Sequence, residues 1–82
     1  MDTMDQLGIS LLNIPNNKKA RIVSVDGGTG FLRKLQVMGI RKDQEIKIVS
    51  KQPFRGPLTI EVSGSQLTLG RGMAKKIMVE VI

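Results

Sequence analysis

The clearest structural signal in this chain lies in residues 58–69, whose sequence is LTIEVSGSQLTL. Every second residue from Leu58 to Val62 is apolar, which is the period of a strand with one buried face and one solvated face. The dipeptide Gly64-Ser65 is typical of a hairpin turn, and the alternation then resumes up to Leu69. This segment therefore predicts an antiparallel hairpin.

Three further segments carry a strand signal on either side of this hairpin. Residues 19–25 (KARIVSV) are rich in β-branched side chains, residues 45–48 alternate, and residues 77–81 place their apolar side chains on one face. Together with the hairpin they make five strands. A short apolar run at residues 9–14 and one helical turn at residues 73–76 complete the expected elements.

One α-helix is expected between the first two strands, over residues 31–38. Four apolar residues fall at i, i+1, i+4 and i+7 and share one helical face: Phe31, Leu32, Leu35 and Met38. Gly39 follows where a residue with left-handed backbone commonly ends a helix. We expect Leu35 to fix this helix to the core.

A glycine-rich stretch, DGGTG at residues 26–30, joins the first strand to this helix. Such a turn can hold an anion at a helix start, but the Lys-Ser/Thr pair of a phosphate-binding loop is missing. The simpler interpretation is a sharp turn in which the glycines adopt positive φ.

Five short strands would expose two sheet edges, and closure into a barrel removes most of that aggregation risk. The predicted fold is therefore mainly β: a small SH3-like β-barrel of about five strands, with an OB-like arrangement as the alternative. One short α-helix lies between the first two strands, and a helical turn precedes the last strand. Residues 1–8 are expected to form a flexible leader, and residues 9–82 the barrel domain.

The composition of the 82 residues excludes most catalytic chemistry. There is no Cys and no His, so disulfides, zinc fingers, iron–sulfur clusters and His-dependent triads are ruled out. The carboxylates are scattered, and we expect no enzyme activity, no catalytic residue, no metal site and no cofactor. An acidic N-terminus and the lack of an apolar run of about 20 residues favour a cytoplasmic protein.

The charge is distributed unevenly along the chain. Thirteen Lys/Arg and seven Asp/Glu give a net charge of +6. Residues 1–17 hold two Asp and no basic residue, so residues 18–82 carry 13 − 5 = +8. This balance favours acidic partners. Only two aromatic residues are present, both Phe, which leaves no platform for stacking bases and makes nucleic acid an unexpected partner.

What remains is a basic binding surface. Four basic residues flank the expected helix and its exit: Arg33, Lys34, Arg41 and Lys42. Phe54 and Arg55 occupy the loop at residues 53–57, where an aromatic beside an arginine has the composition of an interface hot spot. The alternative for Phe54 is that it folds back over the barrel mouth.

Four stretches resemble the ferrous iron transport protein A (FeoA) family: LLNIP with KKARIV (residues 11–23), LQVMGI (35–40), GPLTIEV (56–62) and residues 67–79. The resemblance implies an SH3-like domain, also found at the C-terminus of DtxR-type repressors. It further implies a cytoplasmic accessory of bacterial ferrous iron uptake. The implied partner is the FeoB permease, whose cytoplasmic face carries a GTPase domain, so that contact with the membrane is indirect.

Two alternatives stay open at this point, a basic nucleic-acid-binding small β-barrel and a metal-responsive regulatory domain. Weak self-association also stays open.

Overall fold

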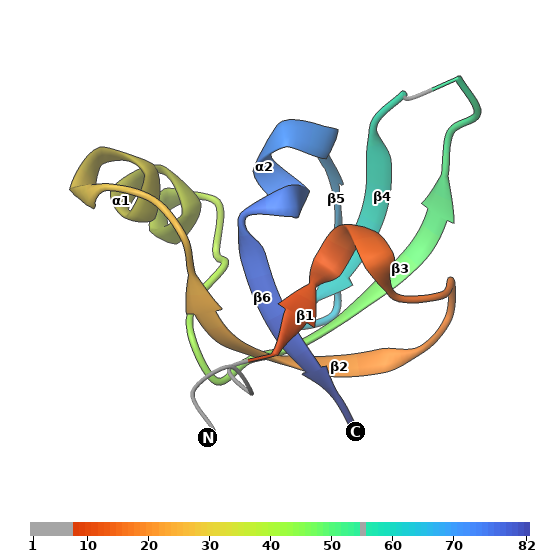
Figure 1. The fold of residues 1–82 in the computed structure, drawn as a ribbon, viewed down its shortest axis with the longest axis horizontal. Coiled ribbons are helices and arrows are strands. Elements are labelled where there is room, and N and C mark those ends of the chain that lie inside the picture. The colour runs from red at the N-terminus through yellow and green to blue at the C-terminus, as the bar shows by residue number, and fades with distance from the viewer. Residues whose placement is uncertain (1–7, 55) are drawn as a thin grey trace.

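The computed structural model describes residues 8–54 and 56–82 and contains strands, two α-helices and one 3-10 helix (Figure 1). The strands are β1 (Ile9–Ser10), β2 (Lys19–Val25), β3 (Glu45–Lys51), β4 (Leu58–Val62), β5 (Ser65–Leu69) and β6 (Ile77–Val81). The helices are η2 (Leu11–Asn13), α1 (Thr29–Val37) and α2 (Arg71–Lys75). The predicted leader, apart from Gly8, lies outside the described residues.

The strands form one antiparallel sheet in the order β1-β6-β2-β3-β4-β5, an SH3-like small β fold. The predicted SH3-like fold class is thus confirmed. All five predicted strands are present, and the described residues add a sixth; the prediction that they close into a barrel is wrong, because the sheet is not closed. The additional strand, β1, has only two residues, too few for a period to appear in the sequence.

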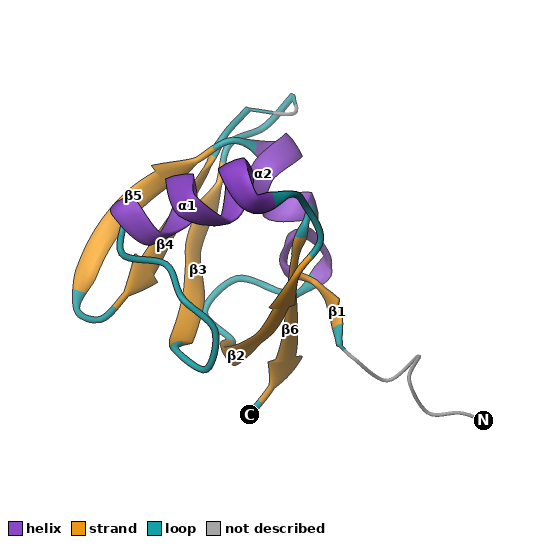
Figure 2. Cartoon of the chain, turned by 90° about the vertical axis from the view of Figure 1, so that its left-hand side faces the viewer, coloured by secondary structure: helices purple, strands orange, loops and turns teal. Residues whose placement is uncertain are grey.

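Two irregularities in strand pairing curve the sheet. The register between β2 and β6 shifts between Ile22 and Ser24, and that between β3 and β4 shifts between Ile48 and Ser50. An extra residue in one strand bends it and increases its twist, so the sheet folds around a single core (Figure 2).

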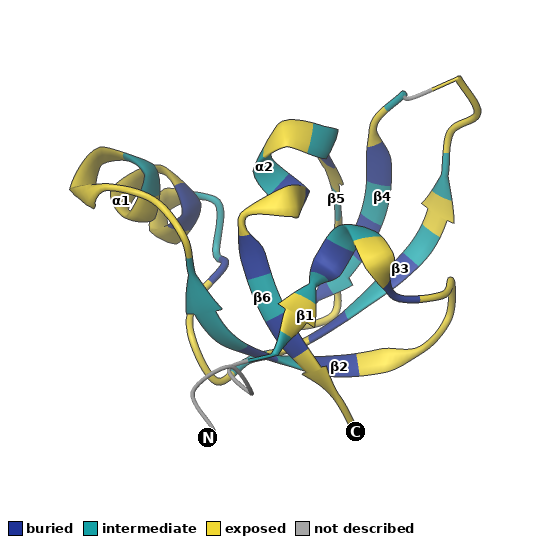
Figure 3. Ribbon diagram, viewed as in Figure 1, coloured by how far each residue is buried: buried dark blue, intermediate teal, exposed yellow. Residues whose placement is uncertain are grey.

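The core consists of the apolar residues that alternate along the strands, as the sequence predicted. Buried residues appear as dark blue bands that alternate with half-buried ones along β2, β3 and β4 (Figure 3). No polar or charged residue among residues 8–54 and 56–82 is buried. The largest fully buried side chains are Leu11, Ile14, Ile22, Leu35, Ile40, Ile46, Ile48, Leu58, Ile60, Leu69, Ile77 and Val79.

The hairpin between β4 and β5 turns one residue earlier than predicted. Ser63 and Gly64, with φ of 53° and 81°, occupy the turn, whereas Ser65 already pairs with Val62. Two successive residues with positive φ give the turn a twist that matches the strands on either side. The expected helical turn at residues 73–76 is likewise shifted and becomes α2, which starts at Arg71.

The glycine-rich turn before α1 does not use positive φ, so that expectation is wrong; among the described residues, the glycines with positive φ are Gly8, Gly39 and Gly64. Gly27 is needed for close approach instead. A Cβ atom placed there would lie 2.6 Å from Cδ2 of Phe31. The Lys76 ammonium lies over the Phe31 ring, 5.2 Å from the centroid of the ring, and this contact ties the first turn of α1 to the end of α2.

Candidate protein-binding surfaces

The helix α1 begins and ends by backbone geometry alone. It starts at Thr29, two residues earlier than predicted, after Gly28, and no side chain caps it. At its end Gly39, with φ of 89°, donates to the carbonyl of Gln36 (3.0 Å), and Ile40 donates to the carbonyl of Leu35 (2.9 Å). This pair of bonds is a Schellman motif, and the apolar contact that accompanies it joins the two buried residues Leu35 and Ile40.

Only one side of α1 is anchored in the core. Leu35 is buried, as predicted, and Phe31 and Met38 pack partly against the core. Leu32, predicted on the same buried face, is instead 39% exposed, and Val37 is 84% exposed. Helix α1 stands at one end of the molecule (Figure 1), and most of its residues are exposed (Figure 3), the apolar Leu32 and Val37 among them.

The four predicted basic residues come together around this helix. Arg33 and Lys34 are exposed on α1, and Arg41 and Lys42 are exposed on the segment that follows it. Within residues 8–54 and 56–82, none of the four forms an ion pair; the two pairs found there are Arg21–Glu80 and Lys47–Glu61. The Arg41 segment is held by Gln44, whose side-chain Oε1 accepts from the Arg41 amide at 2.6 Å.

A groove of about 270 Å³ runs between α1 and β2. Leu32, Leu35 and Gln36 line it on the helix side, and residues 23–25 line it on the strand side. Ile40 and Lys42 complete the lining. We call this feature the α1–β2 groove; it combines apolar walls with one of the four basic residues at its edge.

Phe54 lies far from this groove. The loop between β3 and β4 stands at the opposite end of the longest axis of the molecule, which measures 36 Å (Figure 1). The Phe54 side chain is 97% exposed, so it does not fold back over the core, and its φ is 57°. Arg55 lies outside the described residues. The structure therefore separates the predicted site into two surfaces.

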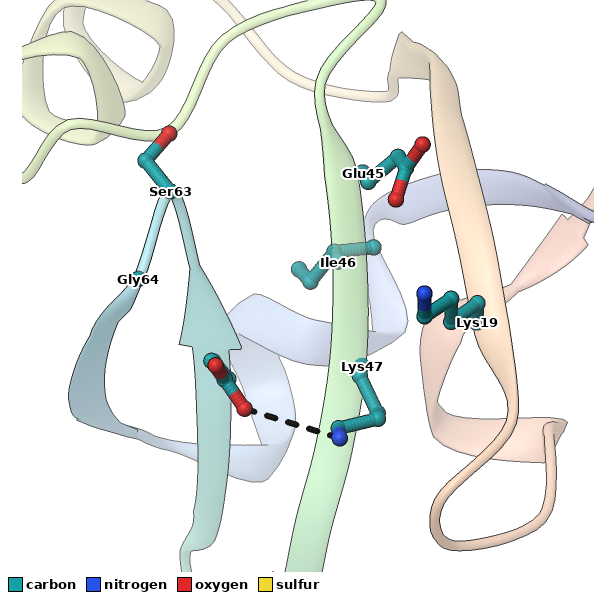
Figure 4. A pocket seen from close by; sticks show the side chains of 7 residues that line it. Lys19, Glu45, Ile46, Lys47, Ser63 and Gly64 are labelled. Carbon is teal, nitrogen blue, oxygen red and sulfur yellow. Dashed lines mark ion pairs between the residues drawn. The ribbon is translucent and has the colours of Figure 1, made fainter.

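A second hollow of about 340 Å³ lies across the outer faces of β2, β3 and β4 (Figure 4). Its charged side chains alternate in sign: Lys19, Glu45, Lys47 and Glu61. Lys47 Nζ lies 3.6 Å from Glu61 Oε1, and both side chains are at least one third exposed. A solvated ion pair of this kind stabilises little, and exposed charges do not form a protected site for acid–base chemistry.

Sequence reasoning missed the apolar part of the candidate surface. Val37 lies off the apolar stripe of α1, and this was a usable signal, since an apolar residue on a solvated face is a candidate for contact with a partner. No pattern in the sequence predicted that residues 23–25 would line the groove. Their exposure depends on where β3 begins, because β3 pairs only with residues 19–21 of β2.

The described residues offer neither a cluster of metal ligands nor a helix that could span a membrane. Within the described ranges, no three residues among His, Cys, Asp and Glu come close enough to hold a metal ion. The α-helices of that same part of the chain are all too short to cross a bilayer.

The architecture is that of a small SH3-like domain whose candidate sites lie on its outer surface. Residues 9–81 match the family described as FeoA domain, and the chain therefore belongs to this family of Fe²⁺ transport accessory proteins. The family is not a known family of enzymes. The predicted resemblance is confirmed.

Relatives agree with this assignment. A candidate Fe(2+) transport protein A of Methanocaldococcus jannaschii is 39% identical over 59 residues, which cover 72% of this chain and 70% of the relative. The solution structure of a FeoA-like protein from Clostridium acetobutylicum is 31% identical with a TM-score of 0.84, and the match covers 94% of this chain and 90% of that one.

The same fold occurs within longer proteins. A manganese-dependent transcriptional repressor in complex with manganese matches 89% of this chain with a TM-score of 0.82, but the match covers only 36% of the repressor. At 20% identity this likeness concerns the fold alone.

Proposed function

We propose that this protein is a cytoplasmic accessory of ferrous iron uptake that acts by binding the cytoplasmic, GTPase-containing region of a FeoB-type permease. The observation that carries the proposal is the match to the FeoA domain over residues 9–81, which includes every strand and helix of the fold. Function then resides in contacts of the outer surface.

The surface chemistry supports a protein partner. The exposed apolar side chains Leu32 and Val37 lie on α1 beside cationic side chains that have no ion-pair partner within the described residues. Exposed apolar groups with charges around them are typical of an interface that excludes water at its centre.

Deletion of the gene tests this function. We expect ferrous iron uptake to fall in cells that lack the protein, and we expect tagged protein to co-purify the permease from solubilised membranes. Restoring the wild-type chain should recover both. Unchanged uptake, together with no association between the purified chain and the permease's cytoplasmic region, would reject the proposal.

A further inference from the structure

The edge of β2 that faces β3 loses its pairing partner halfway along the strand, whereas the opposite edge stays paired with β6. Residues 19–21 pair with β3, and Ile22 still exchanges backbone hydrogen bonds with the segment before β3, donating to Gln44 (2.9 Å) and accepting from Asp43 (2.8 Å). Beyond Ile22, β2 pairs with β6 alone, through Ser24 and Val25. Within residues 8–54 and 56–82, no backbone group lies hydrogen-bonded on the other edge of residues 23–25.

This open edge faces the α1–β2 groove. Residues 23–25 line the groove and are only half-buried, although they belong to a strand in the middle of the sheet order. The pairing shift between Ile22 and Ser24 lies at the same place. Bulges commonly end pairing or redirect a strand beside a functional site.

The residues that line the α1–β2 groove indicate which kind of ligand it could bind. Leu32 and Val25 offer apolar contact, whereas Ser24, Gln36 and Lys42 supply the polar groups. The volume of about 270 Å³ falls just below the range of roughly 300–1,000 Å³ that is usual for small-molecule pockets. An extended peptide segment suits the site better than a small molecule. The open edge of β2 offers main-chain hydrogen bonds, and the residues beside that edge can contact every second side chain of the bound segment.

The charged residues around the groove indicate that its partner is negatively charged. Lys42 lines the groove, and Arg41 adjoins it in sequence; Arg33 and Lys34 extend from α1. The carboxylates nearest in sequence, Asp26 and Asp43, are exposed and form no ion pair with these cations.

We therefore propose that the α1–β2 groove binds an extended, acidic segment of a partner protein, which adds a short strand to residues 23–25 of β2 and places apolar side chains beneath Leu32. The inference rests on the proposed function only for which protein carries that segment.

Peptide titration of the full-length, isotope-labelled chain, followed by amide NMR, tests this site directly. The probe is the synthetic peptide acetyl-EVEVDVE-amide, in which valines alternate with carboxylates, and its control is acetyl-KVKVKVK-amide. We expect the acidic peptide to shift the amide signals of residues 23–25, Leu32 and Gln36 and to slow hydrogen exchange in residues 23–25. The basic peptide should shift none of them.

Matched variants locate the contact. Leu32→Ser and Lys42→Glu should each weaken binding of the acidic peptide by roughly threefold to tenfold. Ile82→Ser and Lys18→Glu make the same kinds of change at exposed residues that do not line the groove, and they should leave binding unaltered. An acidic peptide without effect at millimolar concentration, shifts along β5 instead, equal binding of the basic peptide, or equal loss in the control variants would overturn the inference.

The permease provides a separate readout. If its cytoplasmic region binds the wild-type chain and the Lys42→Glu and Leu32→Ser variants equally well, the groove is not the docking site, whereas the proposed function stands. If that region does not bind the wild-type chain, the proposed function fails, and the peptide titration still decides whether the groove accepts an acidic strand.

Discussion

The Lys51 ammonium lies 3.0 Å from the carbonyl oxygen of Ile14 and 3.2 Å from that of Leu12, and it donates to both. These carbonyls end the 3-10 helix η2, whose start is capped by Ser10 Oγ accepting from the Leu12 amide at 3.2 Å. Leu11 and Ile14 are fully buried. One side chain of β3 thus fixes the segment that covers the core ahead of β2.

Replacing Lys51 by Met should lower the free energy of unfolding by about 1.5–3 kcal/mol, because it removes charged hydrogen bonds from partly buried carbonyls. Urea denaturation measures this. Lys47→Met is the matched control on the same strand: its ion pair with Glu61 is exposed, and the loss there should stay below about 1 kcal/mol. Equal losses in the two variants would show that the Lys51 contacts contribute nothing specific.

Leu35→Ala should cost about 2–5 kcal/mol, since this residue is the one fully buried side chain among the described residues of α1. A domain of this size has only a small reserve of stability, so the variant should be largely unfolded. Thermal melting followed by circular dichroism measures the change. Val37→Ala, at an 84% exposed position, should shift the unfolding free energy by no more than about 0.5 kcal/mol. A mild effect at Leu35 would mean that α1 contributes little to the core.

Gly39→Val tests the left-handed end of α1. A Cβ atom at Gly39 would meet nothing within 4 Å, so steric contact is not at issue, and the cost comes from φ of 89° alone. We expect a loss of about 1–2 kcal/mol for Val and less for Gly39→Asn, because Asn tolerates this region of the backbone. Denaturant midpoints of the two variants provide the comparison. A Val variant as stable as wild type would contradict the Schellman geometry.

Phe54→Ser tests the second predicted surface. The side chain is 97% exposed and its φ is 57°, so we expect no loss of stability. If the loop carries an interface hot spot, binding to the permease's cytoplasmic region should weaken by about thirtyfold, as measured by calorimetry. Ile82→Ser, at another exposed apolar residue, is the control. Unchanged binding of the Phe54 variant would remove this loop from the interface.

The two surfaces lie at opposite ends of the molecule, so double variants should separate their roles. Lys42→Glu and Phe54→Ser share no contact, and additive effects on permease binding are expected if both surfaces touch the partner. An effect of only one variant would assign the interface to one end.

The sequence errors at Leu32 and at the glycine-rich turn have physical causes. A helical period shows which residues share a face, but the width of the contact depends on how closely α1 approaches the sheet. Here Leu35 is fully buried, whereas Phe31 and Met38 are only partly covered. Gly27 shows the same limit, because its requirement comes from the Phe31 ring four residues later rather than from its own φ. The exposure of Leu32 and the need for glycine at position 27 both depend on distances in the folded structure, which a pattern of residue types does not give.

What the sequence determined by itself is local. The two-residue and 3.6-residue periods identified the buried side chains and most strands, because side-chain direction follows directly from backbone geometry. Gly39 likewise marked the end of α1. The open sheet, the two-residue strand β1, the groove beneath α1 and the separation of Phe54 from the basic residues were decided only by tertiary structure. Each depends on which distant segments become neighbours, and the spacing of residues along a chain does not record that.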